Sequence, residues 1–146
     1  MIRVDVLNTY TGSTALPDTD ATERFLSACL RRLALDDCEV SVMITNDAGI
    51  QQLNREYRNI DTPTDVLSFA QIEQDEDILP SGFLGDIVVS VDTLRENCEY
   101  FDVPVEQEFR RLLLHGLLHL IGYDHASNDA DEKMLSLQER MLAELG

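Results

Sequence analysis

The stretch from Arg110 to His125, which reads RRLLLHGLLHLIGYDH, decides the fold of this chain. Seven of the ten residues from Leu112 to Ile121 are Leu or Ile, and helical spacing spreads them around the whole helix. A helix that is apolar all round is a buried one. Ten residues are too few to cross a bilayer, which needs about 20. The stretch therefore predicts a helix at the centre of a folded core, ended by Gly122 in a left-handed conformation.

All three histidines of the chain lie in this stretch, at His115, His119 and His125. The first two are four residues apart, so one face of the helix presents both rings about one turn apart. A chain reversal at Gly122 allows the third to return toward them. Zinc with three protein ligands keeps a fourth position open, which is the arrangement of catalytic sites. We therefore predict one zinc ion on these three imidazoles, although nickel and iron suit imidazole too.

The outer ring nitrogens of metal-binding histidines need hydrogen-bond acceptors. Asp86, Glu108 and Asp124 are the candidates for this role, and the sequence does not choose among them.

The histidine spacing matches that of the metzincin peptidases, H-E-x-x-H-x-x-G-x-x-H. In those enzymes the Glu after the first His is the general base, and Gly116 stands at that position here. The ligand pattern is therefore kept while the usual base for peptide hydrolysis is missing. A phosphodiester is the alternative substrate, and Arg58, in a loop rich in turn-forming residues, can supply the bidentate cation that such a substrate needs.

Length and composition indicate one domain over residues 1–146. The formal charge of −17 argues against a broad nucleic-acid-binding surface, although a few arginines can still act in one cleft. Three scattered cysteines provide no disulfide framework, and no signal peptide or membrane span is recognisable. We therefore expect a cytoplasmic protein that does not contact the membrane.

Hydrophobic periodicity predicts an α+β fold with about four strands and five helices. Alternating or continuous apolar residues indicate strands near Ile2–Val6, Cys38–Ile44, Val66–Phe69 and Gly85–Ser90. Helical spacing covers roughly Ala21–Leu35, Asn46–Tyr57, Asp92–Tyr100, Pro104–Gly122 and Met134–Leu142.

Capping residues sharpen the helix starts. Asp20 and Glu23 resemble a capping box, while Asn46 and Asp92 are expected to cap the second and third helices. Pro104 suits the first turn of the central helix.

Three blocks of this chain resemble the YbeY family, a group of single-domain, metal-dependent endoribonucleases of ribosomal RNA maturation. They are Tyr57-Arg58 with Asp61–Phe69, Leu84–Ser90, and His115–His125. The resemblance implies a mixed four-stranded sheet, zinc on the three histidines and a functional Arg58. The chain departs from the family pattern at Ile60, where a Lys is expected, and at Ala70, where Pro often follows Phe69.

This resemblance implies a single-strand-specific endoribonuclease that acts in small-subunit ribosomal RNA 3′-end processing and in ribosome quality control. Its partners would be ribosomal RNA and ribosomal or ribosome-assembly proteins. Two rival functions remain open on the residues alone. One is a metallopeptidase or amidohydrolase of metzincin-like geometry, and the other is a non-catalytic assembly factor with a structural metal.

Overall fold

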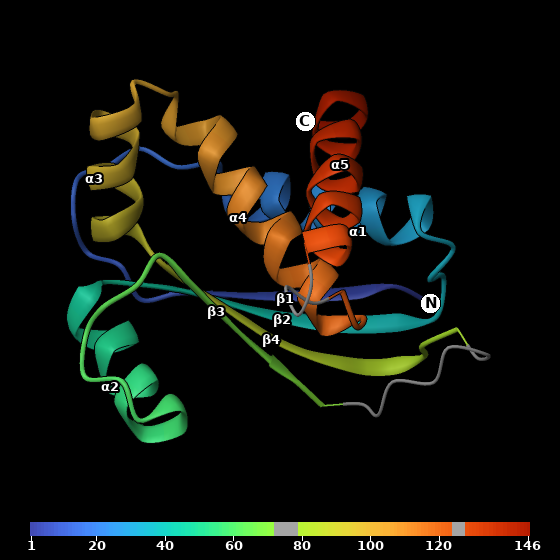
Figure 1. Cartoon of the computed structure of the whole chain (residues 1–146), viewed down its shortest axis with the longest axis horizontal. Coiled ribbons are helices and arrows are strands. Elements are labelled where there is room, and N and C mark those ends of the chain that lie inside the picture. Colours follow the sequence, from blue (N-terminus) through green and yellow to red (C-terminus); the bar gives the residue numbers. More distant parts are fainter. Residues whose placement is uncertain (72–78, 124–127) are drawn as a thin grey trace.

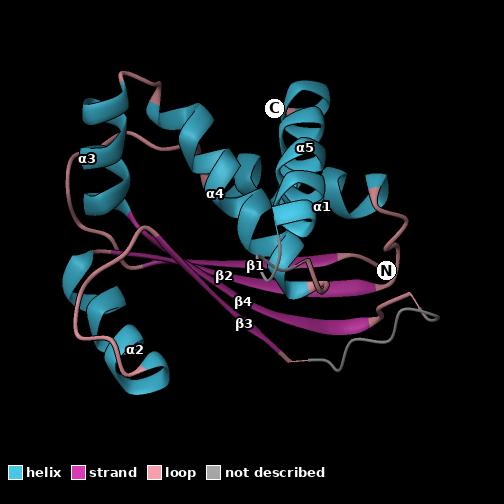
Figure 2. Cartoon of the chain, viewed as in Figure 1, coloured by secondary structure: helices cyan, strands magenta, loops and turns pink. Residues whose placement is uncertain are grey.

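The computed structural model describes residues 1–71, 79–123 and 128–146. Its elements, in chain order, are β1 (Arg3–Asn8), α1 (Thr19–Arg32), β2 (Cys38–Thr45), α2 (Asp47–Arg58), β3 (Val66–Ala70), β4 (Gly82–Ser90), α3 (Val91–Phe101), α4 (Val105–Leu120) and α5 (Asn128–Leu145). Among the described residues, these four strands and five helices confirm the predicted α+β fold, and Figures 1 and 2 show their arrangement.

The four strands form one mixed sheet in the order β1-β2-β4-β3. The pairs β1–β2 and β2–β4 are parallel, and β3 runs antiparallel to β4 at the edge. Glu39 pairs with Phe83 while Val40 pairs with Gly85, so Leu84 is an extra residue that makes a bulge in β4.

Helices cover the two faces of the sheet unequally. Figure 1 shows α1, α3, α4 and α5 on one side and α2 alone on the other. The helix-covered side holds most of the core, because Val40, Val42 and Ile44 alternate inward along β2. The other side, which we call the back face, is only partly covered.

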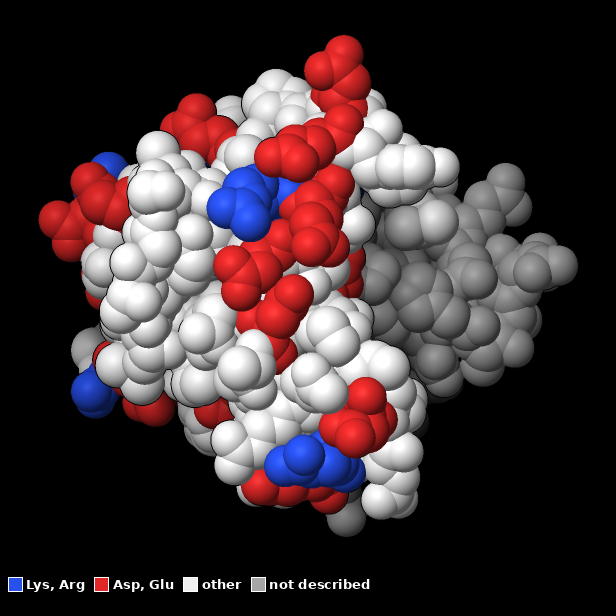
Figure 3. All heavy atoms as spheres, turned by 90° about the vertical axis from the view of Figure 1, so that its left-hand side faces the viewer, with Lys and Arg blue, Asp and Glu red and all other residues white. Residues whose placement is uncertain are grey.

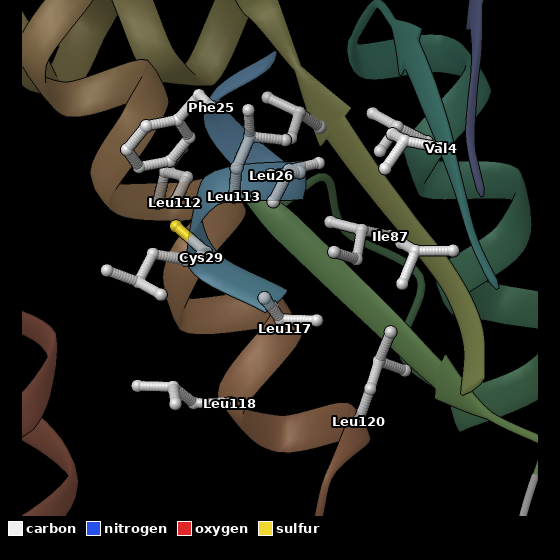
Figure 4. Packing of buried hydrophobic residues seen from close by; sticks show 14 of the residues in the cluster. Val4, Phe25, Leu26, Cys29, Ile87, Leu112, Leu113, Leu117, Leu118 and Leu120 are labelled. Atoms are coloured by element: carbon white, nitrogen blue, oxygen red, sulfur yellow. The ribbon is translucent and has the colours of Figure 1, made fainter. Parts of the chain in front are cut away.

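The apolar helix α4 is central, as its sequence predicts. Its leucines meet α1 and β4 in one buried cluster, which Figure 4 shows around Leu113, Leu117 and Ile87. The backbone after it turns at Gly122, whose φ of +104° is the left-handed conformation expected there. Within the described residues, no helix has both the length and the apolar character needed to cross a bilayer.

Two helix starts differ from the prediction. The cap of α1 is Asp18, whose carboxylate accepts from the backbone N–H of Ala21 at 2.7 Å, because Asp18 is still extended while Asp20 is already helical. Asp92 lies inside the first turn of α3 and accepts instead from the backbone N–H of Asp47 at 2.9 Å. Asn46 caps α2 as predicted, through Gly49 at 2.9 Å.

Two further boundaries differ. β4 begins at Gly82, three residues before the expected start, because Gly82 and Phe83 pair with β2 before the bulge at Leu84. Pro104 is the residue before α4 and has an extended backbone, with a ψ of 138°.

Candidate metal and phosphate site

Two imidazoles of α4 face each other beside β3. The Nε2 atoms of His115 and His119 lie 3.1 Å apart, and the half-buried rings are nearly perpendicular, at 79°. This convergence follows from the four-residue spacing, which places both side chains on one face of the helix.

The outer nitrogen of His115 is held by a side chain of α5. Its Nδ1 lies 2.8 Å from Oε1 of Gln138, and the amide nitrogen of Gln138 donates to Glu139 at 3.1 Å. Because the amide donates to that carboxylate, its oxygen is the atom that faces the ring. An amide oxygen only accepts, so this contact favours a proton on Nδ1 of His115.

The outer nitrogen of His119 has a backbone partner. Its Nδ1 lies 3.0 Å from the carbonyl oxygen of Tyr123, which also can only accept. Acceptors at both Nδ1 atoms favour the tautomer that leaves each Nε2 able to bind a cation. A cation bound by both Nε2 atoms would lie between the two rings. Two nitrogens about 2.1 Å from one tetrahedral zinc lie roughly 3.4 Å apart, close to the observed separation.

The ion pair between Arg111 and Glu139 holds the side-chain amide of Gln138 in place. Arg111 donates from Nε and Nη2 to the carboxylate of Glu139, at 3.0 and 2.9 Å. The hydrogen bond from Arg111 lowers the pKa of Glu139 below its ordinary value, so this carboxylate is ionised at neutral pH and accepts from the Gln138 amide. The same contact raises the pKa of Arg111. The chain Arg111–Glu139–Gln138 thus fixes the orientation of the His115 ring.

Of the three acidic residues considered as anchors for the histidines, Asp86 and Glu108 have other positions or partners. Asp86 lies on the back face with Ser41, because its neighbour Ile87 occupies the side facing α4. Glu108 instead accepts from Nη1 of Arg111 at 2.5 Å. Asp124 lies outside the described residues.

Gln138 was not among the sequence candidates. It is 4% exposed and lies on the stripe of α5 that also buries Met134 and Met141. A polar residue on the buried stripe of an amphipathic helix requires a partner, and this pattern was the signal that could have found it.

The third predicted ligand, His125, lies outside the described residues. Among the residues that are described, no group of three His, Cys, Asp or Glu side chains comes together. The described part of the site is therefore the pair His115 and His119, and the third ligand stays a prediction.

Arg58 lies in the same cleft as the two histidines. It is the last residue of α2, and its Nη2 donates to the carbonyl oxygen of Ser68 at 2.6 Å, at the open edge of β3. A cleft of about 520 Å³ is lined by Arg58, His115 and His119 together. Residues separated by 57 positions in the chain, as Arg58 and His115 are, thus share one concave surface.

Gly116 also lines this cleft, and its missing side chain has a packing reason. A Cβ atom added there would lie 2.9 Å from Cγ2 of Ile87, which is fully buried. A Glu at this position, as in metzincins, would have to displace Ile87 from the sheet. The close approach of α4 to β4 is therefore incompatible with a general base at residue 116.

Positive charge is sparse around the cleft. Among its described lining residues, Arg58 is the one Lys or Arg, and Ile60 is an apolar residue that is 51% exposed. Elsewhere acid dominates: Figure 3 shows a band of Asp and Glu side chains across the side of the molecule where α2 and α3 lie. Polyanions are repelled from that band, so Arg58 is the cation available to an anionic substrate in this cleft.

Comparisons with known proteins show which family this chain resembles. The family model described as Endoribonuclease YbeY matches residues 12–146. A protein of Treponema denticola named Endoribonuclease YbeY is 44% identical over 127 residues, which cover 86% of this chain and 82% of that protein. A protein of Oceanobacillus iheyensis with the same name is 43% identical, over 87% of this chain and 87% of that protein.

A solved structure also has this fold. The solution structure of a Thermotoga maritima protein superposes with a TM-score of 0.67 at 28% identity, over 99% of this chain and 89% of that one. The family match spans nearly the whole chain and includes both histidines of α4 and Arg58. The chain belongs to the YbeY endoribonuclease family.

Proposed function

We propose that this protein is a zinc-dependent endoribonuclease that holds one ion on His115, His119 and His125. The observation that carries the proposal is the 3.1 Å approach of two Nε2 atoms whose rings are both oriented by acceptors at Nδ1. A bound cation supplies a Lewis acid to a phosphodiester in the cleft.

Arg58 is the residue that binds the phosphate in this proposal. A guanidinium has five N–H donors, and the printed contact with the Ser68 carbonyl uses Nη2. The remaining donors can hold non-bridging phosphate oxygens, in the bidentate geometry that suits arginine. The carbonyl contact and the ring of Phe69, 5.2 Å away, keep the side chain at the mouth of the cleft.

Single-stranded RNA is the substrate that this cleft suits. A concave site of about 520 Å³ accommodates a phosphodiester with its adjoining groups, whereas a duplex is too wide to enter it. A flexible strand can bend one phosphodiester into the cleft while its neighbours stay outside.

The ribosomal part of the proposal rests on family membership and on charge. A chain of net charge −17 with one cleft arginine gains little affinity from phosphates alone. We therefore propose that ribosomal or assembly proteins help to present the RNA, during small-subunit 3′-end processing and ribosome quality control in the cytoplasm.

The test uses purified protein, a single-stranded RNA and the matching duplex, with and without added zinc. Cleavage should require the metal, prefer the single strand and fall at least tenfold in Arg58→Ala, with partial recovery in Arg58→Lys. Arg55→Ala is the matched control, because Arg55 lies one turn earlier on α2 and pairs with Asp61 at 3.8 Å instead of lining the cleft.

Two results would contradict the proposal. Metal-dependent turnover of a peptide or amide without RNA cleavage would indicate the hydrolase with metzincin-like ligands. A His119→Ala variant that retains full cellular function without bound metal would indicate a non-catalytic assembly factor.

A further inference from the structure

The back face of the sheet has a pocket on the other side of β3 from the metal cleft. It has a volume of about 370 Å³, with the sheet as its floor and α2 as one wall. Its lining residues are Leu7, Ser41, Met43, Leu53, Tyr57, Phe69, Gln71, Asp86 and Val88. Ligand pockets for small planar groups have this size and this apolar character with few polar groups.

Among the described lining residues of this pocket, Asp86 is the one that carries a charge. In the sheet it pairs with Ser41 on one side and with Phe69 on the other, so the three residues form one row across the floor. The Asp86 side chain is half-buried, and among the described residues no hydrogen bond or ion pair engages its carboxylate. A carboxylate in such a place is an acceptor for a ligand that brings N–H donors.

An aromatic pair forms the rim of the pocket. The rings of Tyr57 and Phe69 meet edge to face, with centroids 5.4 Å apart, and Tyr57 is 66% exposed. Exposed aromatic rings beside a cation are the usual platform on which single-stranded nucleic acids stack their bases.

Arg58 connects the pocket to the cleft. Its guanidinium lines the cleft with His115 and also lies over the ring of Phe69, which lines the pocket. The two concave sites therefore meet at the edge of β3, where Arg58 stands between them. A strand whose phosphate is held by Arg58 has its adjoining nucleotide within reach of the pocket.

We propose that this pocket binds a nucleobase of the RNA next to the phosphate held by Arg58, with a preference for guanine. This inference rests on the proposed function. Guanine presents two adjacent donors, N1–H and the 2-amino group, which match the two oxygens of Asp86. The ring stacks against Tyr57, and the apolar floor excludes water. The chain thus selects the nucleotide beside the scissile position, with the base and the phosphate on opposite faces of the edge strand.

The experiment measures binding of short single-stranded RNAs to the zinc-loaded protein by fluorescence anisotropy, and cleavage of the same RNAs. The probes are an all-uridine strand, the same strand with one guanosine, and the same strand with inosine in its place, which lacks the 2-amino group. The guanosine strand should bind about tenfold more tightly than the uridine strand, with inosine between them.

Two variants separate stacking from recognition. Tyr57→Leu should weaken the binding of all three RNA strands by about tenfold, because every base has a face that can stack on an aromatic ring. Asp86→Asn should reduce or remove the preference for the guanosine strand over the uridine strand. Tyr100→Leu is the control, since Tyr100 is an aromatic residue of α3 that is 83% exposed and lies outside the pocket.

The outcomes distinguish the two proposals. A wild-type protein that cuts and binds all three strands equally, with Tyr57→Leu unchanged, overturns the base pocket and leaves the nuclease intact. A wild-type protein that neither binds nor cuts RNA overturns both. Tyr57 is exposed enough for its variant to fold, so its result stands even if Asp86→Asn proves unstable.

Discussion

The Nδ1 atom of His115 lies 2.8 Å from the Oε1 atom of Gln138, which is 23 residues further along the chain. This bond sets the tautomer and the angle of a predicted metal ligand from a different helix. It also makes the metal affinity of α4 dependent on the position of α5.

Replacing Gln138 with Met should weaken zinc binding about 10- to 100-fold, the usual effect of removing the acceptor behind a histidine ligand. The dissociation constant can be measured by competition with a chromophoric chelator. Gln138→Glu should keep near wild-type affinity, because its carboxylate still accepts from Nδ1. Equal zinc affinity in Gln138→Met and wild type would show that the bond does not position His115.

A new cation at residue 60 should strengthen RNA binding. Ile60 lines the cleft and is half exposed, so a Lys there adds one phosphate contact beside Arg58. The plot of log affinity against log salt concentration should steepen by about 0.7 for a single strand. Leu135→Lys adds the same charge on α5, outside the cleft, and should leave the slope unchanged. Equal slopes for both variants would mean that the RNA does not pass residue 60.

Gly116→Ala should destabilise the fold in spite of the better helix propensity of Ala. The added Cβ would press on the buried Cγ2 of Ile87 at 2.9 Å. Overpacking of this kind costs about 1–3 kcal/mol, and the propensity gain of about 1 kcal/mol offsets only part of it. Denaturant unfolding should therefore show a net loss of roughly 0–2 kcal/mol.

A double-mutant cycle tests the contact behind that expectation. Ile87→Ala alone should cost about 2–5 kcal/mol, because it leaves a cavity. In the double variant the Cβ of residue 116 occupies part of that cavity. The double variant should therefore lose less stability than the sum of the losses in the two single variants. Strict additivity would show that residues 87 and 116 do not press on each other.

The stability of the protein should fall steeply in alkali because of Cys29. Burial raises the pKa of this thiol from 9.0 to about 12. Below pH 9 the thiol is protonated in both the folded and the unfolded protein, so its contribution to the free energy of unfolding is fully present. From pH 9 to 12 only the unfolded chain loses the proton, which removes about 1.4 kcal/mol of stability per pH unit.

The measurement is the free energy of unfolding as a function of pH, compared between wild type and Cys29→Ala. Other groups titrate in the same range in both proteins, so the difference in slope isolates this thiol. Wild type should lose stability more steeply than the variant above pH 9. Parallel curves would show that Cys29 ionises without penalty in the folded protein.

Local spacing in the sequence was sufficient for the elements and for part of the site. The four-residue interval between His115 and His119 placed two imidazoles on one helical face, since helix geometry is the same in any protein. The Asn46 cap and the left-handed Gly122 were also predictable, because each depends on a few neighbouring residues. The cap at Asp18 was missed because Asp20 offers the same local chemistry two residues later.

The tertiary structure decided the partners that come from distant segments. Both faces of β4 are largely apolar, so alternation along the strand could not show that Asp86 lies on the back face, away from the histidines. Gln138 reached His115 only because α5 packs against α4, and Arg58 reached the cleft only because α2 ends beside the edge strand β3. The sequence by itself determined which residues are neighbours along a helix or strand, since backbone geometry sets those distances. The tertiary structure decided which faces of the helices and strands pack together. That packing depends on the apolar surface buried by the whole chain, because the helices are divided between the two sides of one sheet.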